Sequence, residues 1–144
     1  MALIHAALTD GDYGMDITDA DGHTIRLDIP VAQGGLGSGF RPMQTLLAAL
    51  AGCSSVDIVM ILKKQKQDLQ GLEIEVDGER EEGKEPALWR TIDVNFKLSG
   101  DVDPQKAERA VELSMQKYCS VAETLRKAGA EIRYVVFVNN IPVN

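Results

Sequence analysis

The segment from Leu46 to Gln65, LLAALAGCSSVDIVMILKKQ, restricts the fold of this chain more than any other part of it. It is almost entirely apolar. With Pro42 suited to a first helical turn and Gly71 to a stop, it predicts a helix over residues 42–67, about 39 Å long. A helix that is apolar on all sides needs cover on all sides, and a second subunit is the natural source of that cover. The middle of the segment nevertheless carries polar and ionisable side chains: Cys53, Ser54, Ser55 and Asp57.

The overlapping stretch from Met43 to Leu62 is about long enough to cross a bilayer. We favour a soluble protein, because Asp57 lies near the centre of the segment and a charge there costs a few kcal/mol in a membrane. The chain of 144 residues is 44% hydrophobic and 26% charged, which is ordinary globular composition. It predicts a single domain over residues 1–144, with no membrane association.

Net charge and cysteine content restrict the expected partners and cellular location. The net charge of −7 and the scattered basic residues argue against a nucleic-acid partner. The first residues, MALIHAALTDGD, carry no basic leader and too short an apolar run for a signal peptide. With two cysteines, we expect a cytoplasmic protein in which a disulfide forms only transiently.

The remaining segments predict short strands and two further helices. Asp103 followed by Pro104 is an N-cap with proline at the first helical position, and Ser120 with Glu123 forms a capping box for a later short helix. The order is βββ-α-ββ-αα-β, an α+β fold with a largely antiparallel sheet and helices gathered on one side. Alternating apolar residues and turn signals mark the strands, which cover residues 2–9, 13–18, 23–29, 72–81, 88–98 and 131–138.

Other classes of site find little support in the sequence. The glycine-rich stretch PVAQGGLGSGFRP predicts an irregular loop, and its spacing fits neither the P-loop nor the dinucleotide pattern. His5, His23 and the two cysteines lack the CxxC or HxxxH spacing of metal ligands. The GxSxG elbow of a serine hydrolase is missing as well. We expect no metal and no cofactor.

The two cysteines differ in local context. Cys119 precedes the expected N-cap Ser120, and the amides and dipole of the following helix favour a thiolate there; the alternative is a half-buried, unreactive cysteine. Cys53 lies about three turns into an apolar helix, where burial makes a thiol inert. Asp57 lies one turn further on the same face. It is expected to bind a hydroxyl, an amide or a cation of a neighbouring segment.

The stretches RPMQTLLAALAGCSSVDIVMILKKQ and KYCSVAETL together resemble the OsmC/Ohr family, and in particular its YhfA-like branch. The expected order of elements matches over essentially the whole chain. The resemblance implies an intertwined homodimer with two long central helices back to back. It also implies a stress-response thiol peroxidase that reduces organic hydroperoxides. In that scheme Cys53 attacks the peroxide oxygen, Cys119 resolves the sulfenic acid as a disulfide, and a dithiol reductant reverses it.

The chain departs from the peroxidase branches of this family at two positions. Those branches have a glutamate ten residues before the helix cysteine, where Met43 stands here, and an arginine in the early turn that reads DGDYG here. In the family, this Arg–Glu pair holds the helix cysteine as a thiolate. We interpret Arg41 as a substitute cation and Gln44 as a hydrogen-bonding group, with Asp57 as a further supporting residue.

Two functions therefore stand as predictions. The first is a cytoplasmic, dimeric thiol peroxidase that acts on small organic hydroperoxides through Cys53 and Cys119. The alternative is a non-catalytic dimeric binding protein that has lost the activating Arg–Glu pair. Its cleft would hold a small apolar or acyl ligand.

Overall fold

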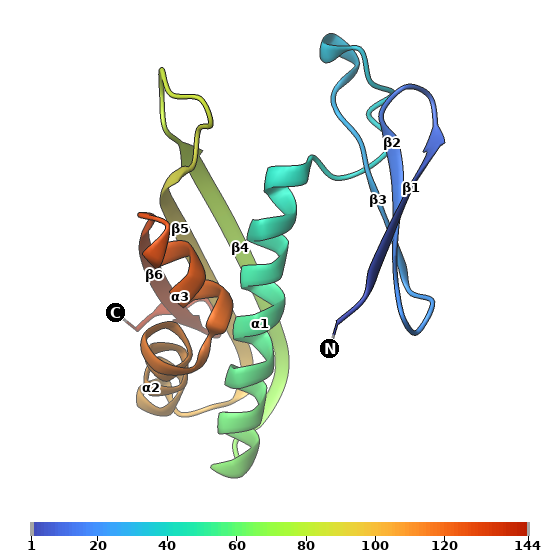
Figure 1. Cartoon of the computed structure of the whole chain (residues 1–144). Helices are drawn as coiled ribbons and strands as arrows, with labels where there is room; N and C mark the ends of the chain where they lie inside the picture. Colours follow the sequence, from blue (N-terminus) through green and yellow to red (C-terminus); the bar gives the residue numbers. More distant parts are fainter. Residues whose placement is uncertain (1, 144) are drawn as a thin grey trace. The chain divides into compact units, whose positions relative to one another are not determined.

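The computed structural model describes residues 2–143, which divide into two compact units, one up to Leu46 and one from Leu47 onward. The single domain over residues 1–144 stays a prediction. In chain order the elements are β1 (Ile4–Asp10), β2 (Gly14–Asp19), β3 (Thr24–Leu27), the 3-10 turn η1 (Val31–Gln33), α1 (Pro42–Lys64), β4 (Asp68–Arg80), β5 (Trp89–Asp101), α2 (Pro104–Leu113), the π-helical turn η2 (Ser114–Tyr118), α3 (Ser120–Lys127), β6 (Glu131–Val138) and β7 (Ile141–Pro142) (Figure 1).

The first unit is a three-stranded antiparallel sheet in the order β1-β2-β3. The sequence predicts these three strands, and the DADG segment forms the turn between β2 and β3, with Gly22 in the left-handed region at φ 90°. The apolar side chains of this sheet are poorly covered within one chain. Ile4 is 61% exposed, Leu8 59% and Ile25 50%.

The glycine-rich loop after β3 is organised around the buried carboxylate of Asp28. Its oxygens accept hydrogen bonds from the backbone N–H groups of Ile29 (2.7 Å), Leu36 (3.2 Å) and Ser38 (3.1 Å). They also accept one from the Ser38 hydroxyl at 2.7 Å. Because these donors already face a carboxylate of the chain itself, the loop does not offer them to a phosphate group.

Asp28 should release this loop only in strong acid. Hydrogen bonds from the Ser38 hydroxyl and amide, followed by that from Ile29, hold the pKa of the carboxyl at about 2, below its ordinary value of 3.8. A lowered pKa means that the contribution of Asp28 to stability is complete above pH 3.8 and is lost as the pH falls through 2. We expect an NMR titration of the Asp28 carboxyl to show that midpoint. Amide exchange at Leu36 and Ser38 should accelerate below it, and D28A should accelerate it already at pH 7. An unshifted midpoint would contradict this assignment.

The second unit packs α1, α2 and α3 on one face of a mixed four-stranded sheet in the order β4-β5-β6-β7 (Figure 1). The opposite face is charged: Arg133 pairs with Asp93 at 2.6 Å and Lys97 with Glu75 at 2.6 Å. The acidic outer row of β4 is therefore a solvated face, as its alternation predicts. Strand β5 lies at the centre, with four inward side chains in the core: Ile92, Val94, Phe96 and Leu98.

The pairing of the strands within residues 2–143 is largely antiparallel, as the sequence predicts, and the pair β5–β6 is the exception. Strand β6 lies parallel to β5, in register from Thr91 opposite Glu131 to Leu98 opposite Val138. A parallel pair needs a long crossover, and the segment containing α2 and α3 supplies it. The short strand β7 was not predicted. It adds to β6 as an antiparallel edge.

Helix α1 ends at Lys64, earlier than the predicted residue 67. Lys66 adopts a left-handed conformation at φ 56°, and the N–H of Gln67 closes the end of the helix by donating to the carbonyl of Leu62 at 3.0 Å. Gly71 was expected to stop the helix, and that expectation is wrong. It lies inside β4, at a register shift in the pairing with β5.

Within one chain, one side of α1 is buried and the other is partly exposed to solvent. One stripe is fully buried in the core: Leu50, Ser54, Ile58 and Leu62. Elsewhere the helix leaves large apolar side chains 41–56% exposed: Leu46, Val56, Val59 and Met60. The sequence predicts this shortage of cover. Within residues 2–143, α1 is the helix long and apolar enough to cross a membrane, a property that core helices of soluble proteins share.

The predicted N-cap is correct for α2 but not for α3. The Asp103 carboxylate accepts a hydrogen bond from the Lys106 N–H at 3.0 Å, which confirms Asp103 as the N-cap of α2. The capping box at Ser120 is wrong by one residue, because Cys119 is the N-cap of α3 and Ser120 is its first residue.

Candidate active site

The second unit brings the two cysteines together. Helix α1 carries Cys53 and, one turn later, Asp57, while the chain leaving the π-helical turn carries Cys119. The two sulfurs and a carboxylate oxygen of Asp57 all lie within 4.8 Å of one another. Both cysteines are free thiols; Cys53 is half-buried and Cys119 is 3% exposed. We refer to Cys53, Asp57 and Cys119 as the dithiol–carboxylate cluster.

The π-helical turn Ser114–Tyr118 positions Cys119. Its wider hydrogen-bonding pattern lets the N–H of Cys119 donate to the carbonyl of Ser114 at 2.8 Å, five residues back. At Cys119 the backbone then becomes extended, with φ −73° and ψ 104°, before α3 begins. This change of direction sets the thiol beside α1. The sequence alone predicts a junction between two helices here, but not the extra residue in the turn.

Asp57 is held by a hydroxyl from the π-helical turn. The buried Ser114 side chain donates a hydrogen bond to the carboxylate at 2.9 Å, which confirms the prediction of a partner from a neighbouring segment. Ser114 was not predicted as a site residue. The available signal was its place in the buried row of that helix, where a polar side chain requires a polar partner.

The thiol of Cys119 is harder to ionise than its position at a helix start suggests. Burial raises its pKa to about 11, and the neighbouring Cys53 thiol adds to the effect. The Ala122 N–H does donate to the Cys119 sulfur, at 3.4 Å, and lowers the pKa. That contribution is smaller than the effect of burial, so the expectation of an acidic Cys119 is wrong.

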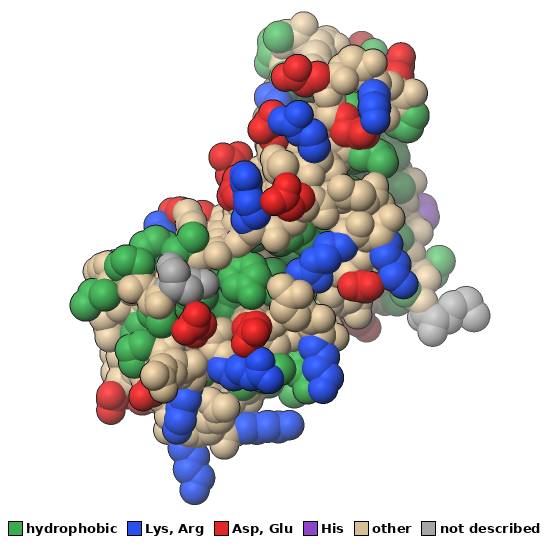
Figure 2. Space-filling view, turned by 90° about the vertical axis from the view of Figure 1, so that its left-hand side faces the viewer, with side chains coloured by type: hydrophobic (Ala, Val, Ile, Leu, Met, Phe, Trp, Pro, Cys, Tyr) green, Lys and Arg blue, Asp and Glu red, His purple; other side chains and the backbone are tan. Residues whose placement is uncertain are grey.

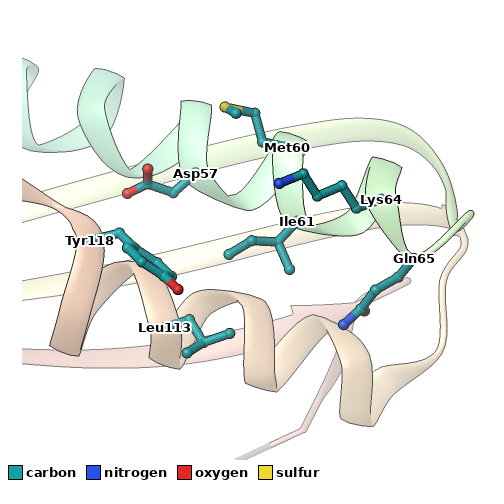
Figure 3. A pocket seen from close by; sticks show the side chains of 7 residues that line it. All are labelled: Asp57, Met60, Ile61, Lys64, Gln65, Leu113 and Tyr118. Carbon is teal, nitrogen blue, oxygen red and sulfur yellow. The ribbon is translucent and has the colours of Figure 1, made fainter.

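An open pocket of about 520 Å³ lies beside the cluster, between the second half of α1 and the segment from α2 to the π-helical turn (Figure 3). The Asp57 carboxylate lies at one end of it and Gln65 at the other (Figure 3). Asp57 therefore belongs both to the pocket wall and to the cluster. The remaining wall is mainly apolar, with one amine: Met60, Ile61, Lys64, Leu113 and Tyr118.

Arg41 and Gln44 are placed in the first unit, at the start of α1. The Gln44 side chain accepts a hydrogen bond from the Arg41 N–H at 3.1 Å, and the Gln44 N–H donates to the Arg41 carbonyl at 3.0 Å. Gln44 thus supports the beginning of the helix. The supporting roles that the sequence suggests for Arg41 and Gln44 at the cysteines stay predictions.

The expectation of no nucleic-acid partner stays a prediction. On the face shown in Figure 2, acidic side chains lie beside basic ones at several places, and a group of basic side chains lies at the lower edge.

Fold and site together define a class of α+β proteins. In this class a long apolar helix places one cysteine beside a second cysteine at the start of a later helix. The sequence model of the family described as OsmC-like protein matches residues 35–135. The chain belongs to this OsmC-like family, as the sequence predicts.

Individual relatives agree with this assignment. Protein YhfA of Escherichia coli K12 is 40% identical over 111 residues, which are 76% of this chain and 78% of YhfA. A hypothetical protein from Aquifex aeolicus has a crystal structure with a TM-score of 0.79 and 28% identity, covering 96% of this chain and 98% of that one. An organic hydroperoxide resistance protein OsmC from Legionella pneumophila shares the fold at a TM-score of 0.73 and 19% identity, covering 96% and 97%.

Proposed function

We propose that this protein reduces small organic hydroperoxides with the two thiols of the dithiol–carboxylate cluster. The observation that carries the proposal is the approach of two free thiols to within 4.8 Å beside an apolar pocket. The half-buried Cys53 is the thiol accessible to a substrate, and the buried Cys119 suits a second step that needs no access from solvent.

The proposed reaction has three balanced steps. The Cys53 sulfur attacks the terminal peroxide oxygen, the O–O bond breaks, and the products are a sulfenic acid on Cys53 and an alcohol. The Cys119 thiol then attacks the sulfenic sulfur, which forms the disulfide and releases water. An external dithiol reduces the disulfide by exchange and becomes a disulfide itself. In the second step, the two sulfurs must move from within 4.8 Å of each other to the length of a disulfide bond, about 2.05 Å.

The charges of the cluster set the expected rate. Burial raises the pKa of the Cys119 thiol, and the family's Arg–Glu pair has no sequence equivalent at Met43 and in DGDYG. We therefore propose a slower peroxidase than members that keep this pair. The same facts favour the alternative function, a non-catalytic protein whose apolar pocket holds a small apolar or acyl ligand.

The partner that we propose is a second copy of the chain. The exposed apolar side chains on α1, including Val56 and Met60, and those on the first sheet, including Ile4 and Leu8, need cover that one chain does not give them. Two long helices packed back to back would supply it for α1. We also propose a cytoplasmic location, since recycling of the disulfide requires a dithiol reductant.

Trapping of the intermediate tests the assignment of the two cysteines. C119S treated with one equivalent of cumene hydroperoxide should accumulate a sulfenic acid on Cys53, because the resolving thiol is absent. Dimedone should label Cys53 there, as peptide mapping by mass spectrometry would show. Wild type should instead form a Cys53–Cys119 disulfide that a dithiol reverses.

C53S is the matched variant for the trapping experiment and should remain unlabelled. Dimedone on Cys119 in C53S, together with none on Cys53 in C119S, would reverse the two roles. Absence of both sulfenic acid and disulfide would favour the ligand-binding alternative.

A further inference from the structure

The dithiol–carboxylate cluster has the donor set of a metal site as well as that of a redox pair. Two cysteine sulfurs and a carboxylate oxygen lie within 4.8 Å of one another. Zinc binds cysteine sulfur at about 2.3 Å and carboxylate oxygen at about 2.0–2.2 Å, so tetrahedral donors lie just under about 4 Å apart. Small side-chain rotations would therefore converge these three atoms on one ion.

The placement of the three donors matches that of metal ligands. Cys53 and Asp57 are one turn apart on the same face of α1, the spacing by which a helix commonly offers two ligands to one ion. Cys119 comes from a separate element, so the donors enclose the ion from two sides. The Ser114 hydroxyl, which donates to the carboxylate at 2.9 Å, corresponds to the outer hydrogen bond that orients a ligating carboxylate.

The cluster contains a carboxylate, Asp57, without a positively charged partner in the described part of the chain. Among residues 2–143, none of the basic side chains forms an ion pair with Asp57. A divalent ion would supply this missing positive charge, and a thiolate bound to a metal is stabilised by the metal's own charge.

We propose that the reduced cluster binds one thiophilic divalent cation of the Zn²⁺ type. Cys53 and Cys119 bind it as thiolates and Asp57 as a carboxylate, and water takes the fourth position. Two thiol protons are released for each ion bound. Binding needs only the reduced thiols, so this site does not depend on the proposed peroxidase activity.

Metal binding and oxidation exclude each other, since a disulfide sulfur no longer carries the thiolate charge. If the hydroperoxide chemistry also holds, the two thiolates, one hydroperoxide and two protons give the disulfide, an alcohol and water, and the divalent ion leaves. The ion would then protect the thiols until an oxidant displaces it. This coupling is the one step here that rests on the proposed function.

Cobalt substitution tests the site without any peroxide. The full chain is freed of metal, reduced with a phosphine in the absence of oxygen, and titrated with Co²⁺. We expect a thiolate-to-cobalt charge-transfer absorption that saturates at one ion per chain and disappears when Zn²⁺ is added. C53S and C119S should lose this saturable band. D57N should weaken the apparent affinity roughly 10-fold or more, and Asp57→Cys should restore it with stronger absorption.

The control variant is H23A. His23 lies with Asp19 and Asp21 in an exposed turn whose three side chains also come within 4.8 Å of one another. H23A should leave the band unchanged. The proposal is overturned if wild type shows no thiolate-to-cobalt band. It is also overturned if D57N, with a circular dichroism spectrum like that of wild type, binds as tightly as wild type, or if H23A removes the band.

Discussion

C53S should abolish the hydroperoxide-dependent oxidation of a dithiol by this protein, reducing turnover to the buffer rate. We expect a loss of at least ~10³-fold, because an attacking nucleophile has no substitute in the site. Serine preserves the size of the side chain, so the half-buried position is not disrupted. The measurement is consumption of cumene hydroperoxide with a dithiol reductant, with a chelator present to keep the cluster free of divalent ions.

C119S should behave differently from C53S. Without the resolving thiol, the sulfenic acid on Cys53 persists until the external dithiol reduces it. The turnover rate therefore depends on the dithiol concentration. S55A is a matched control on α1, since the Ser55 hydroxyl donates only to the carbonyl of Gly52, at 2.7 Å, and lies outside the cluster. It should keep the wild-type rate. If wild type consumes hydroperoxide no faster than C53S, the peroxidase proposal is contradicted and the ligand-binding function is favoured.

The sequence predicts the elements of this fold better than their contacts. Periodicity and turn residues give the order βββ-α-ββ-αα-β, because each signal is local. The parallel pairing of β6 with β5 depends on the position and direction in which the chain re-enters the sheet after α2 and α3. Tertiary packing determines that position, and local sequence does not. The length of the crossover between these strands was the usable signal, since an antiparallel neighbour needs only a short turn.

The candidate site shows the same division between local and tertiary information. Cys53 and Asp57 share a helix face that the sequence defines, and the resemblance adds Cys119. The convergence of all three depends on a π-helical turn that helical periodicity does not reveal. The sign of the pKa shift at Cys119 also needed the structure, because local sequence shows the helix start but not the 3% exposure that outweighs it.

Two adjacent positions on α1 should separate folding from assembly. Ile58 is fully buried in the core, whereas its neighbour Val59 is 43% exposed on the side that we assign to the second copy. I58K buries an unpaired charge at a cost of about 3–5 kcal/mol, comparable with the total stability of a small domain. It should unfold the chain, with loss of the helical circular dichroism signal. L50K should do the same, since Leu50 is also fully buried.

V59K should keep the fold but weaken the dimer. A lysine at a partly exposed helical position disturbs one chain little, yet in an apolar interface it loses its hydration without gaining a partner. We expect V59K to retain its helical signal at high concentration and to melt at a lower temperature on dilution, because a dimer's stability depends on concentration. Sedimentation would then show a shift toward monomer at concentrations where wild type stays dimeric. A wild-type protein that sediments as a folded monomer at micromolar concentration would contradict the dimer. Equal effects of I58K and V59K on folding would contradict the assignment of the two sides of α1.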